Sequence, residues 1–308
     1  MILIISDKSD KYADRVESIL QENAAEYSRL NLDVESLRST QIKFEDDAFI
    51  IEGPNCCFST NEIEAVWNRG TRIEQFIDAG CTHDKSIFIW KEVWNKTLEK
   101  LFATLESTKW LNFYHDFYVG SQFRPYAISN YIGLKWPSYI CSNDINYLNN
   151  FFESKKDRLL ELMNQNCSVN KTGDCSEKCG DRFGTIAPSE KPLDGCPVAN
   201  AAYGVRCTIV GKEYFVGKIK SNTNGDVRNT IINQSKNEII QPPRSIKLKA
   251  IQIMNELNLT HGVFDFIVKD NDEWVFDALN PIGQYQWVED IQDSDISLSV
   301  AKWLMINN

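Results

Sequence analysis

The segment GVFDFIVKDNDEWVFDALNP, residues 262–281, decides the fold class of this chain. Two apolar runs, rich in β-branched and aromatic residues, flank a polar turn at 270–272, and this pattern predicts two successive antiparallel strands. Asp265 interrupts the first run between two phenylalanines. A buried carboxylate is costly without a cation or a hydrogen-bond donor, so a partner for Asp265 is expected nearby. Asn280 ends the second strand, where it could approach Asp265.

A second hairpin is predicted before this pair. The segment GVRCTIVGKEYFVGKIKSN, residues 204–222, contains two strand-like runs that turn at 211–212. Residues an even number apart share a face of a strand. The turn is therefore expected to bring Arg206 and Lys218 to a common face of the hairpin.

The same region carries the chemical groups that phosphate and magnesium require. The polar loop after the hairpin, NTNGDVRN, contains Asp226 and Arg228. Cationic side chains here could bind phosphate oxygens, while Asp265 and Asn280 offer oxygen ligands for Mg²⁺. A single charged residue on a strand is usually solvated, so the order and spacing of the set, rather than any one member, indicate a site for phosphate and magnesium.

The first 115 residues predict an α/β unit. Short apolar runs that alternate with helical patterns favour parallel strand pairing. The expected strands are 2–5, 30–37, 49–52 and 65–68. Ser9 or Asp10 could cap a first helix with four apolar residues on one face: Ala13, Val16, Ile19 and Leu20. The glycine fingerprint of dinucleotide-binding folds is absent after the first strand.

Longer helices are expected further along the chain. Residues 86–108 predict an amphipathic helix whose tryptophan and leucine stripe packs in the core. Residues 118–141 predict a helix, a glycine-centred turn and a strand, and a further helix is expected from about 142 through Met163. Residues 164–197, rich in Gly, Ser, Asn, Asp and Cys, predict irregular structure. The last expected helices are 245–258 and 296–306.

Composition restricts the classes of function. The chain has 308 residues, a formal net charge of −10 and 43% hydrophobic residues, which is ordinary for a globular protein. An acidic chain is a poor candidate for general nucleic-acid or anionic-membrane binding. No positively charged leader with a long apolar run, and no stretch of about eighteen apolar residues, is present. A cytoplasmic location is therefore expected.

The nine cysteines predict reduced thiols, because their number is odd and no leader precedes them. Four of them lie in the irregular segment: Cys167, Cys175, Cys179 and Cys196. Four thiolates could hold Zn²⁺ and so pin a polar segment. Their spacing lacks the paired Cys-x2-Cys of common zinc sites, so free thiols in a loop are the alternative.

Separated motifs, in order along the chain, resemble one family: the ATP-grasp maturases of ribosomally made peptides. These are the graspetide synthetases of the microviridin type and the related maturases of grasp-with-SPASM clusters. The matching motifs are VWNR at 66–69, GLKWPSYICSND at 133–144, RCTIVG at 206–211, FVGKIKS at 215–221, DVR at 226–228, FDF at 264–266 and NPIGQY at 280–285.

The resemblance implies an ATP-grasp fold of the α/β (α+β) class in three parts. These are an N-terminal pre-ATP-grasp α/β domain at 1–115, a central subdomain at 116–203 that contains the irregular 164–197 insert, and a C-terminal subdomain at 204–308. Family members also suggest a homodimer by analogy.

The resemblance also implies an activity. ATP would phosphorylate a side-chain carboxylate of a precursor peptide, and a hydroxyl or amine of that peptide would attack, giving an ester or amide cross-link. Asp265 and Asn280 would be Mg²⁺ ligands. The implied phosphate-binding cations are Arg206, Lys218, Arg228 and, in the central subdomain, Arg124, with Asp226 orienting them.

The chain departs from the family pattern at three places. Ala278 stands where the family has a bridging glutamate, and Asp277 could replace it only through a bulge or register shift. Residues 159–164 lack the expected lysine, for which Lys171 could compensate, and no Gln-Glu pair precedes Arg206. Two hypotheses follow: an active ATP-dependent ligase, or a catalytically degenerate homologue that binds a peptide or partner enzyme as an adaptor.

Overall fold

The computed structural model describes most of the chain. The described residues are 1–69, 73, 85–113, 123–138, 140–144, 146–147, 150–151, 160–162, 167–169, 193–197, 202–220, 238–292 and 295–306. No described helix is long and apolar enough to cross a membrane.

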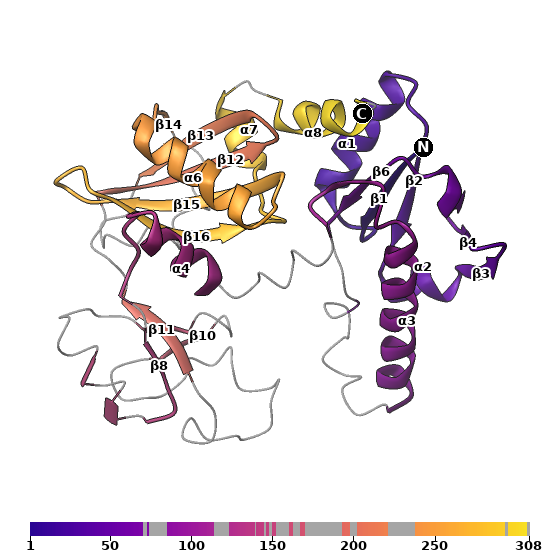
Figure 1. Ribbon diagram of the computed structural model, residues 1–308, viewed down its shortest axis with the longest axis horizontal. Coiled ribbons are helices and arrows are strands. Elements are labelled where there is room, and N and C mark those ends of the chain that lie inside the picture. The colour runs from indigo at the N-terminus through magenta and orange to yellow at the C-terminus, as the bar shows by residue number, and fades with distance from the viewer. Residues whose placement is uncertain are drawn as a thin grey trace.

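The N-terminal unit is built on a parallel sheet (Figure 1). Its strand order is β2-β1-β6-β7, and every neighbouring pair is parallel. The strands are β1 (Ile2–Ser6), β2 (Tyr27–Asn31), β6 (Ala65–Asn68) and β7 (Lys109–Leu111). The expected α/β unit with parallel pairing is confirmed.

Asp10 caps the first helix, α1 (Lys11–Glu22). Its side chain accepts hydrogen bonds from the backbone nitrogens of Tyr12 and Ala13 at 2.9 and 3.2 Å, which satisfies donors that a helix start leaves free. The four apolar residues predicted to share one face are all buried. Strand, cap and helix therefore follow from local sequence here.

The expected strand at 30–37 is wrong. β2 ends at Asn31, and Asp33 then caps the short helix α2 (Val34–Arg38) by accepting a hydrogen bond from the Ser36 nitrogen at 3.0 Å. The apolar run crosses a helix cap, which hydrophobicity alone does not reveal.

A small antiparallel meander and a long helix complete this unit. The meander contains β3 (Gln41–Glu45), β4 (Ala48–Gly53) and β5 (Cys56–Ser59), followed by the 3₁₀ turn η1 (Thr60–Glu62). The long helix is α3 (Lys85–Thr104). Leu98, Leu101 and Phe102 of the predicted stripe are buried, whereas Val93 is 58% exposed. Only the second half of the stripe therefore packs fully in the core.

The C-terminal unit is a five-stranded antiparallel sheet with strand order β14-β13-β12-β15-β16. The strands are β12 (Tyr203–Val210), β13 (Glu213–Lys220), β14 (Glu238–Ile239), β15 (His261–Val268) and β16 (Trp274–Asn280). Both predicted hairpins are confirmed. The first turns at Gly211, whose φ of 57° suits glycine.

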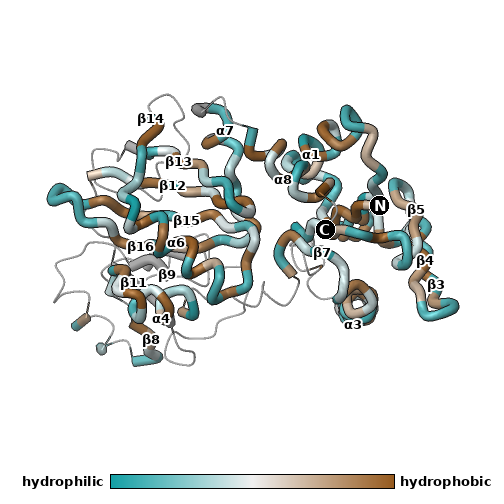
Figure 2. The backbone as a smooth tube through the Cα atoms, turned by 45° about the horizontal axis from the view of Figure 1, so that its top comes forward, coloured by the Kyte–Doolittle hydropathy of each residue, from teal (hydrophilic) through white to brown (hydrophobic). Residues whose placement is uncertain are grey.

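Helices cover one face of this sheet. On it, Val205 and Phe264 pack with α4 (Phe123–Tyr131) and α6 (Arg244–Glu256) in one apolar cluster. Figure 2 shows the hydrophobic residues along β12 and β15. The alternate strand residues, among them Arg206 and Asp265, therefore lie on the other face.

The packing crosses the expected domain boundaries. α4 falls in the range expected for the central subdomain, but it packs on β16 and α6. The closing helix α8 (Ile296–Met305) belongs to the C-terminal range, yet it packs on α1 and β6 of the N-terminal unit (Figure 1). It follows α7 (Gln286–Gln292).

The described part of the middle segment forms an antiparallel sheet with strand order β10-β9-β11-β8. Its strands are β8 (Ile140–Ser142), β9 (Leu160–Leu162), β10 (Cys167–Val169) and β11 (Leu193–Pro197). The helix expected through Met163 is therefore wrong at β9. A short apolar run suits either a helix or a strand, and here pairing with strands on both sides decides it.

Asn112 joins the two main units. It follows β7 directly, has a φ of 61° and is 2% exposed. Its Nδ2 donates to the carbonyls of His261 and Pro281 at 2.7 and 3.0 Å. Its Oδ1 accepts from the nitrogens of Thr260 and His261 at 2.9 Å. One amide therefore fixes the start of β15 and the turn after β16.

We expect Asn112→Ala to lower the free energy of unfolding by about 3 kcal/mol, because buried backbone groups lose their partners. Urea denaturation measures this loss. Asn61→Ala, in the exposed η1 turn, is the matched control. A loss for Asn112→Ala no greater than that of the control would contradict its joining role.

Candidate functional site

An ion pair lies on the sheet face opposite α4 and α6. Arg206 of β12 and Asp265 of β15 are register partners. The arginine donates from Nε to Oδ1 at 2.7 Å and from Nη2 to Oδ2 at 2.8 Å. Burial disfavours the charged guanidinium, but the adjacent carboxylate holds the pKa of Arg206 above its usual value. The predicted cation beside Asp265 is present.

The loop after β16 reaches the same pair. The Gln284 carbonyl accepts a hydrogen bond from Nη1 of Arg206 at 3.1 Å. Asn280 pairs with Val263, two residues from Asp265 on the neighbouring strand, so Asp265 and Asn280 are diagonal neighbours. The Asn280 side chain accepts from the Ile282 nitrogen at 2.9 Å, which shapes the turn.

The strand register decides which residue faces Asp265. Ala278 lies opposite it, while Phe266 pairs with Phe276, so Asp277 is an extra residue in a register irregularity of β16. The bulge through which Asp277 could take the place of the missing glutamate is therefore present. The position across from the carboxylate is nevertheless occupied by a methyl group.

Lys218 lies on the opposite face from Arg206, so the expected common face is wrong. In the hairpin, Arg206 pairs with Gly217 and Lys218 pairs with Val205, whose side chain packs in the helix-covered cluster. Lys218 lies 3.5 Å from a Glu238 carboxylate oxygen and 4.3 Å from the Tyr203 ring centroid. A register offset by one residue reverses the face.

The N-terminal unit contributes Arg69 to this region. Arg69 follows β6 and forms an ion pair with Asp10, the α1 cap, and both side chains are less than 10% exposed. Its guanidinium carbon lies 4.7 Å from the Tyr12 ring centroid, and Nη1 donates to the Ile282 carbonyl at 3.5 Å. Burial raises the pKa of Tyr12, and the charges of Arg69 and Arg206 oppose that shift.

Tyr12 was not predicted from the sequence, because it acts through a contact between units. Gln284 was noted only as part of the NPIGQY motif, and nothing in that motif indicates that its backbone carbonyl binds Arg206. Arg69 was noted only as part of the VWNR motif. Its position after a parallel strand was the usable signal, since the carboxyl ends of such strands are where ligands bind.

The remaining predicted residues are not gathered at this site in the described part of the chain. Arg124 is exposed on the first turn of α4. Asp226, Arg228 and Lys171 lie outside the described residues, as do Cys175 and Cys179.

The zinc prediction is largely untested. Cys167 and Cys196 lie on the strands either side of β9 and pair with adjacent residues of it, Leu162 and Glu161. Within the described residues, no group of three or more His, Cys, Asp or Glu side chains could hold a metal ion.

The donor set fits one magnesium ion and not a bridged pair. Mg²⁺ in nucleotide sites usually takes one or two protein ligands, with water and phosphate oxygens completing its shell. Asp265 and Asn280 can supply those ligands, since Arg206 occupies only part of the acceptor capacity of Asp265. Ala278 has no oxygen with which to bridge a second ion.

His261 is a buried titratable group beside this site. It is 2% exposed, and its Nδ1 lies 3.0 Å from the Ile209 carbonyl. Burial lowers its pKa from 6.5 to about 4. The unfolded chain therefore takes up a proton near pH 6.5 that the folded chain resists until about pH 4. The stability from neutral His261 is complete above pH 6.5 and is lost as pH falls between these values.

We expect this loss to amount to about 2 kcal/mol between pH 7 and pH 5. His261→Gln should unfold with a pH dependence that is smaller by this amount, because glutamine does not titrate. Urea denaturation of both proteins at the two pH values measures the difference. Equal pH dependence in the two proteins would contradict the assignment.

Comparison with known proteins finds solved structures that this chain resembles along its whole length. No family model and no curated protein match the chain. Macrocyclase MdnB from Microcystis aeruginosa, a solved structure, matches with a TM-score of 0.78 at 20% identity, over 99% of both chains. A RiPP-associated ATP-grasp ligase from Chryseobacterium gregarium matches with a TM-score of 0.77 at 20% identity, over 98% of this chain and 96% of that one.

The chain has the ATP-grasp fold. Macrocyclase MdnC from the same Microcystis aeruginosa agrees, with a TM-score of 0.78 at 16% identity over 100% of both chains. The ATP-grasp class expected from sequence is thereby confirmed. The Chryseobacterium structure is a complex with ADP and with a leader and core peptide, and the MdnC structure holds its precursor peptide MdnA.

Proposed function

We propose that this ATP-grasp protein acts in the maturation of a ribosomally made precursor peptide, through ATP-dependent activation of a peptide carboxylate to form an ester or amide cross-link. The observation that supports this most strongly is the end-to-end match, N-terminal unit included, to two macrocyclases, of which MdnC was solved with its precursor peptide bound. A cytoplasmic location and a homodimer belong to this proposal.

Bound Mg²⁺ would neutralise charge on the transferring phosphoryl group and on ADP. Asp265 and Asn280 would hold it. Arg206, fixed by Asp265 and by the Gln284 carbonyl, would face an oxygen of the phosphate or of the acyl phosphate without having to reorganise. Arg228, Asp226 and Arg124 complete the proposed set. Lys218 would need a different role, because Arg206 and Lys218 lie on opposite faces.

A second function has its own support. Ala278 opposite Asp265 removes the bridging ligand, and the bidentate ion pair already balances the charge of Asp265. A chain with this site could bind the peptide, or a partner enzyme, as an adaptor without catalysis.

Nucleotide binding separates the two functions. For a ligase, ATP with Mg²⁺ should raise the melting temperature, since a ligand that binds only the folded state stabilises it. ATP with EDTA is the control, and the shift should shrink without the ion. Absence of any shift at millimolar Mg-ATP would leave the adaptor function standing and exclude the ligase.

A further inference from the structure

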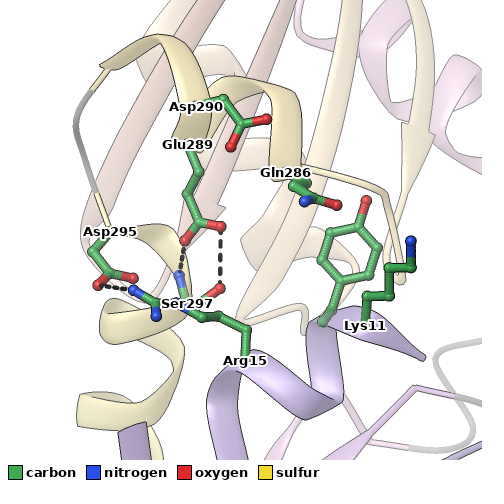
Figure 3. A pocket seen from close by; sticks show the side chains of 8 residues that line it. Lys11, Arg15, Gln286, Glu289, Asp290, Asp295 and Ser297 are labelled. Carbon is green, nitrogen blue, oxygen red and sulfur yellow. Dashed lines mark hydrogen bonds and ion pairs between the residues drawn. The ribbon is translucent and has the colours of Figure 1, made fainter. Parts of the chain in front are cut away.

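A polar pocket with a volume of about 470 Å³ lies between α1 and the α7–α8 segment (Figure 3). Its size is within the range of pockets that hold small ligands. Its lining comes from both units of the molecule: Lys11, Tyr12, Arg15, Gln286, Glu289, Asp290, Asp295 and Ser297. None of these residues belongs to the Arg206–Asp265 pair.

Several charged groups in the pocket already have hydrogen-bonding partners. Arg15 lies 3.3 Å from a carboxylate oxygen of Asp295. Glu289 accepts hydrogen bonds from the nitrogen and the hydroxyl of Ser297. These contacts, drawn as dashed lines in Figure 3, hold the side chains of Arg15 and Glu289 in place.

Two charged side chains in the pocket have no such partner among the described residues. Lys11 and Asp290 are exposed, and neither forms an ion pair or a side-chain hydrogen bond within the described residues. Figure 3 shows Lys11 near Gln286 on one side, and Asp290 beside Glu289 on the other. The pocket therefore has a cationic end and an anionic end. A ligand with only phosphate charge would be repelled by the two carboxylates.

The pocket adjoins the ion pair. Tyr12 lines the pocket, and its ring stacks edge-on against Tyr285 with the centroids 4.9 Å apart. Gln286 lines it as well, two residues after the Gln284 carbonyl that binds Arg206. A chain segment held in the pocket would therefore lead toward the candidate site.

We propose that this pocket binds a segment of the peptide substrate in which a basic side chain lies next to an acidic one. The basic group is held by Asp290 and Glu289, and the acidic group by Lys11. The inference rests on the proposed function, because it takes the ligand to be that function's peptide. It makes the pocket a site that selects the peptide by charge.

The test measures binding of the capped peptide acetyl-Gly-Lys-Glu-Gly-amide by calorimetry, without nucleotide. We expect saturable binding that Asp290→Asn and Lys11→Gln each weaken about tenfold, because each loses a charge-assisted contact. Asp272→Asn and Lys212→Gln remove equal charges from exposed turns outside the pocket and should leave binding unchanged. All four positions are exposed, and the melting temperature of each variant confirms folding.

With the peptides, three results would overturn the proposal: no binding, equal binding of acetyl-Gly-Gln-Gln-Gly-amide, or binding that neither pocket variant weakens. Free L-lysine that bound as tightly as the capped peptide would assign the pocket to a free amino acid instead. Because no ATP is present, the outcome is independent of catalysis. If the tetrapeptide binds but ATP has no effect on the protein, the pocket proposal stands and the ligase proposal fails. If the protein cross-links its peptide but does not bind the tetrapeptide, only the pocket proposal fails.

Discussion

Replacement of Ala278 by glutamate is expected to raise the rate at which the protein forms ADP from Mg-ATP about 100-fold. Ala278 pairs with Asp265 on the sheet face opposite α4 and α6 and is only partly buried. A carboxylate there would supply the oxygen that the site lacks. Single groups that stabilise developing charge typically contribute two to three orders of magnitude to a rate.

Ala278→Gln is the matched control, since it adds the same bulk without the charge. We expect it to leave the rate near that of the parent protein. An equal response to glutamine and glutamate would show that side-chain volume, not metal bridging, is involved. No response in a folded Ala278→Glu variant would show that the missing carboxylate is not what limits the chemistry.

Asp265→Asn is expected to abolish the magnesium-dependent thermal shift and to lower the free energy of unfolding by about 3 kcal/mol. Arg206 would remain largely buried, with only 11% of its side chain exposed and no countercharge beside it. The asparagine is similar in size, so the loss reflects charge. Thermal shift with and without Mg-ATP, and urea denaturation, measure the two effects separately.

Asp272→Asn is the control for this substitution. Asp272 is exposed in the β15–β16 turn with a φ of 59°, a conformation that asparagine tolerates. It should change neither quantity appreciably. A folded Asp265→Asn protein that keeps its full Mg-ATP shift would remove Asp265 from the metal site.

Much of the fold follows from local sequence. Asp10 caps α1 where a cap was expected, and the Gly211 and Asp272 turns join the predicted strand pairs. These features depend on backbone conformation and on side chains within a few residues, which sequence patterns express.

The site was only partly predictable, because its geometry depends on register and on contacts between units. A cation or hydrogen-bond donor beside Asp265 was expected from the sequence. The sequence did not predict that Lys218 is offset from Arg206 by one register position, nor that Tyr12 and Arg69 approach from the N-terminal unit. The strand expected at 30–37 and the helix expected at β9 were wrong because both predictions rest on short apolar runs. Such runs suit either a helix or a strand, and a helix cap or neighbouring strands decide between them.

The most direct measurement is the mass of the precursor peptide after incubation with this protein, ATP and Mg²⁺. Each ester or amide formed through an acyl phosphate removes the elements of one water from the peptide, because the carboxylate oxygen leaves with inorganic phosphate. We therefore expect a peptide lighter by one water for each bond, with matching ADP production. A bound peptide of unchanged mass, with no ADP formed, would contradict ligase activity and identify the chain as an adaptor.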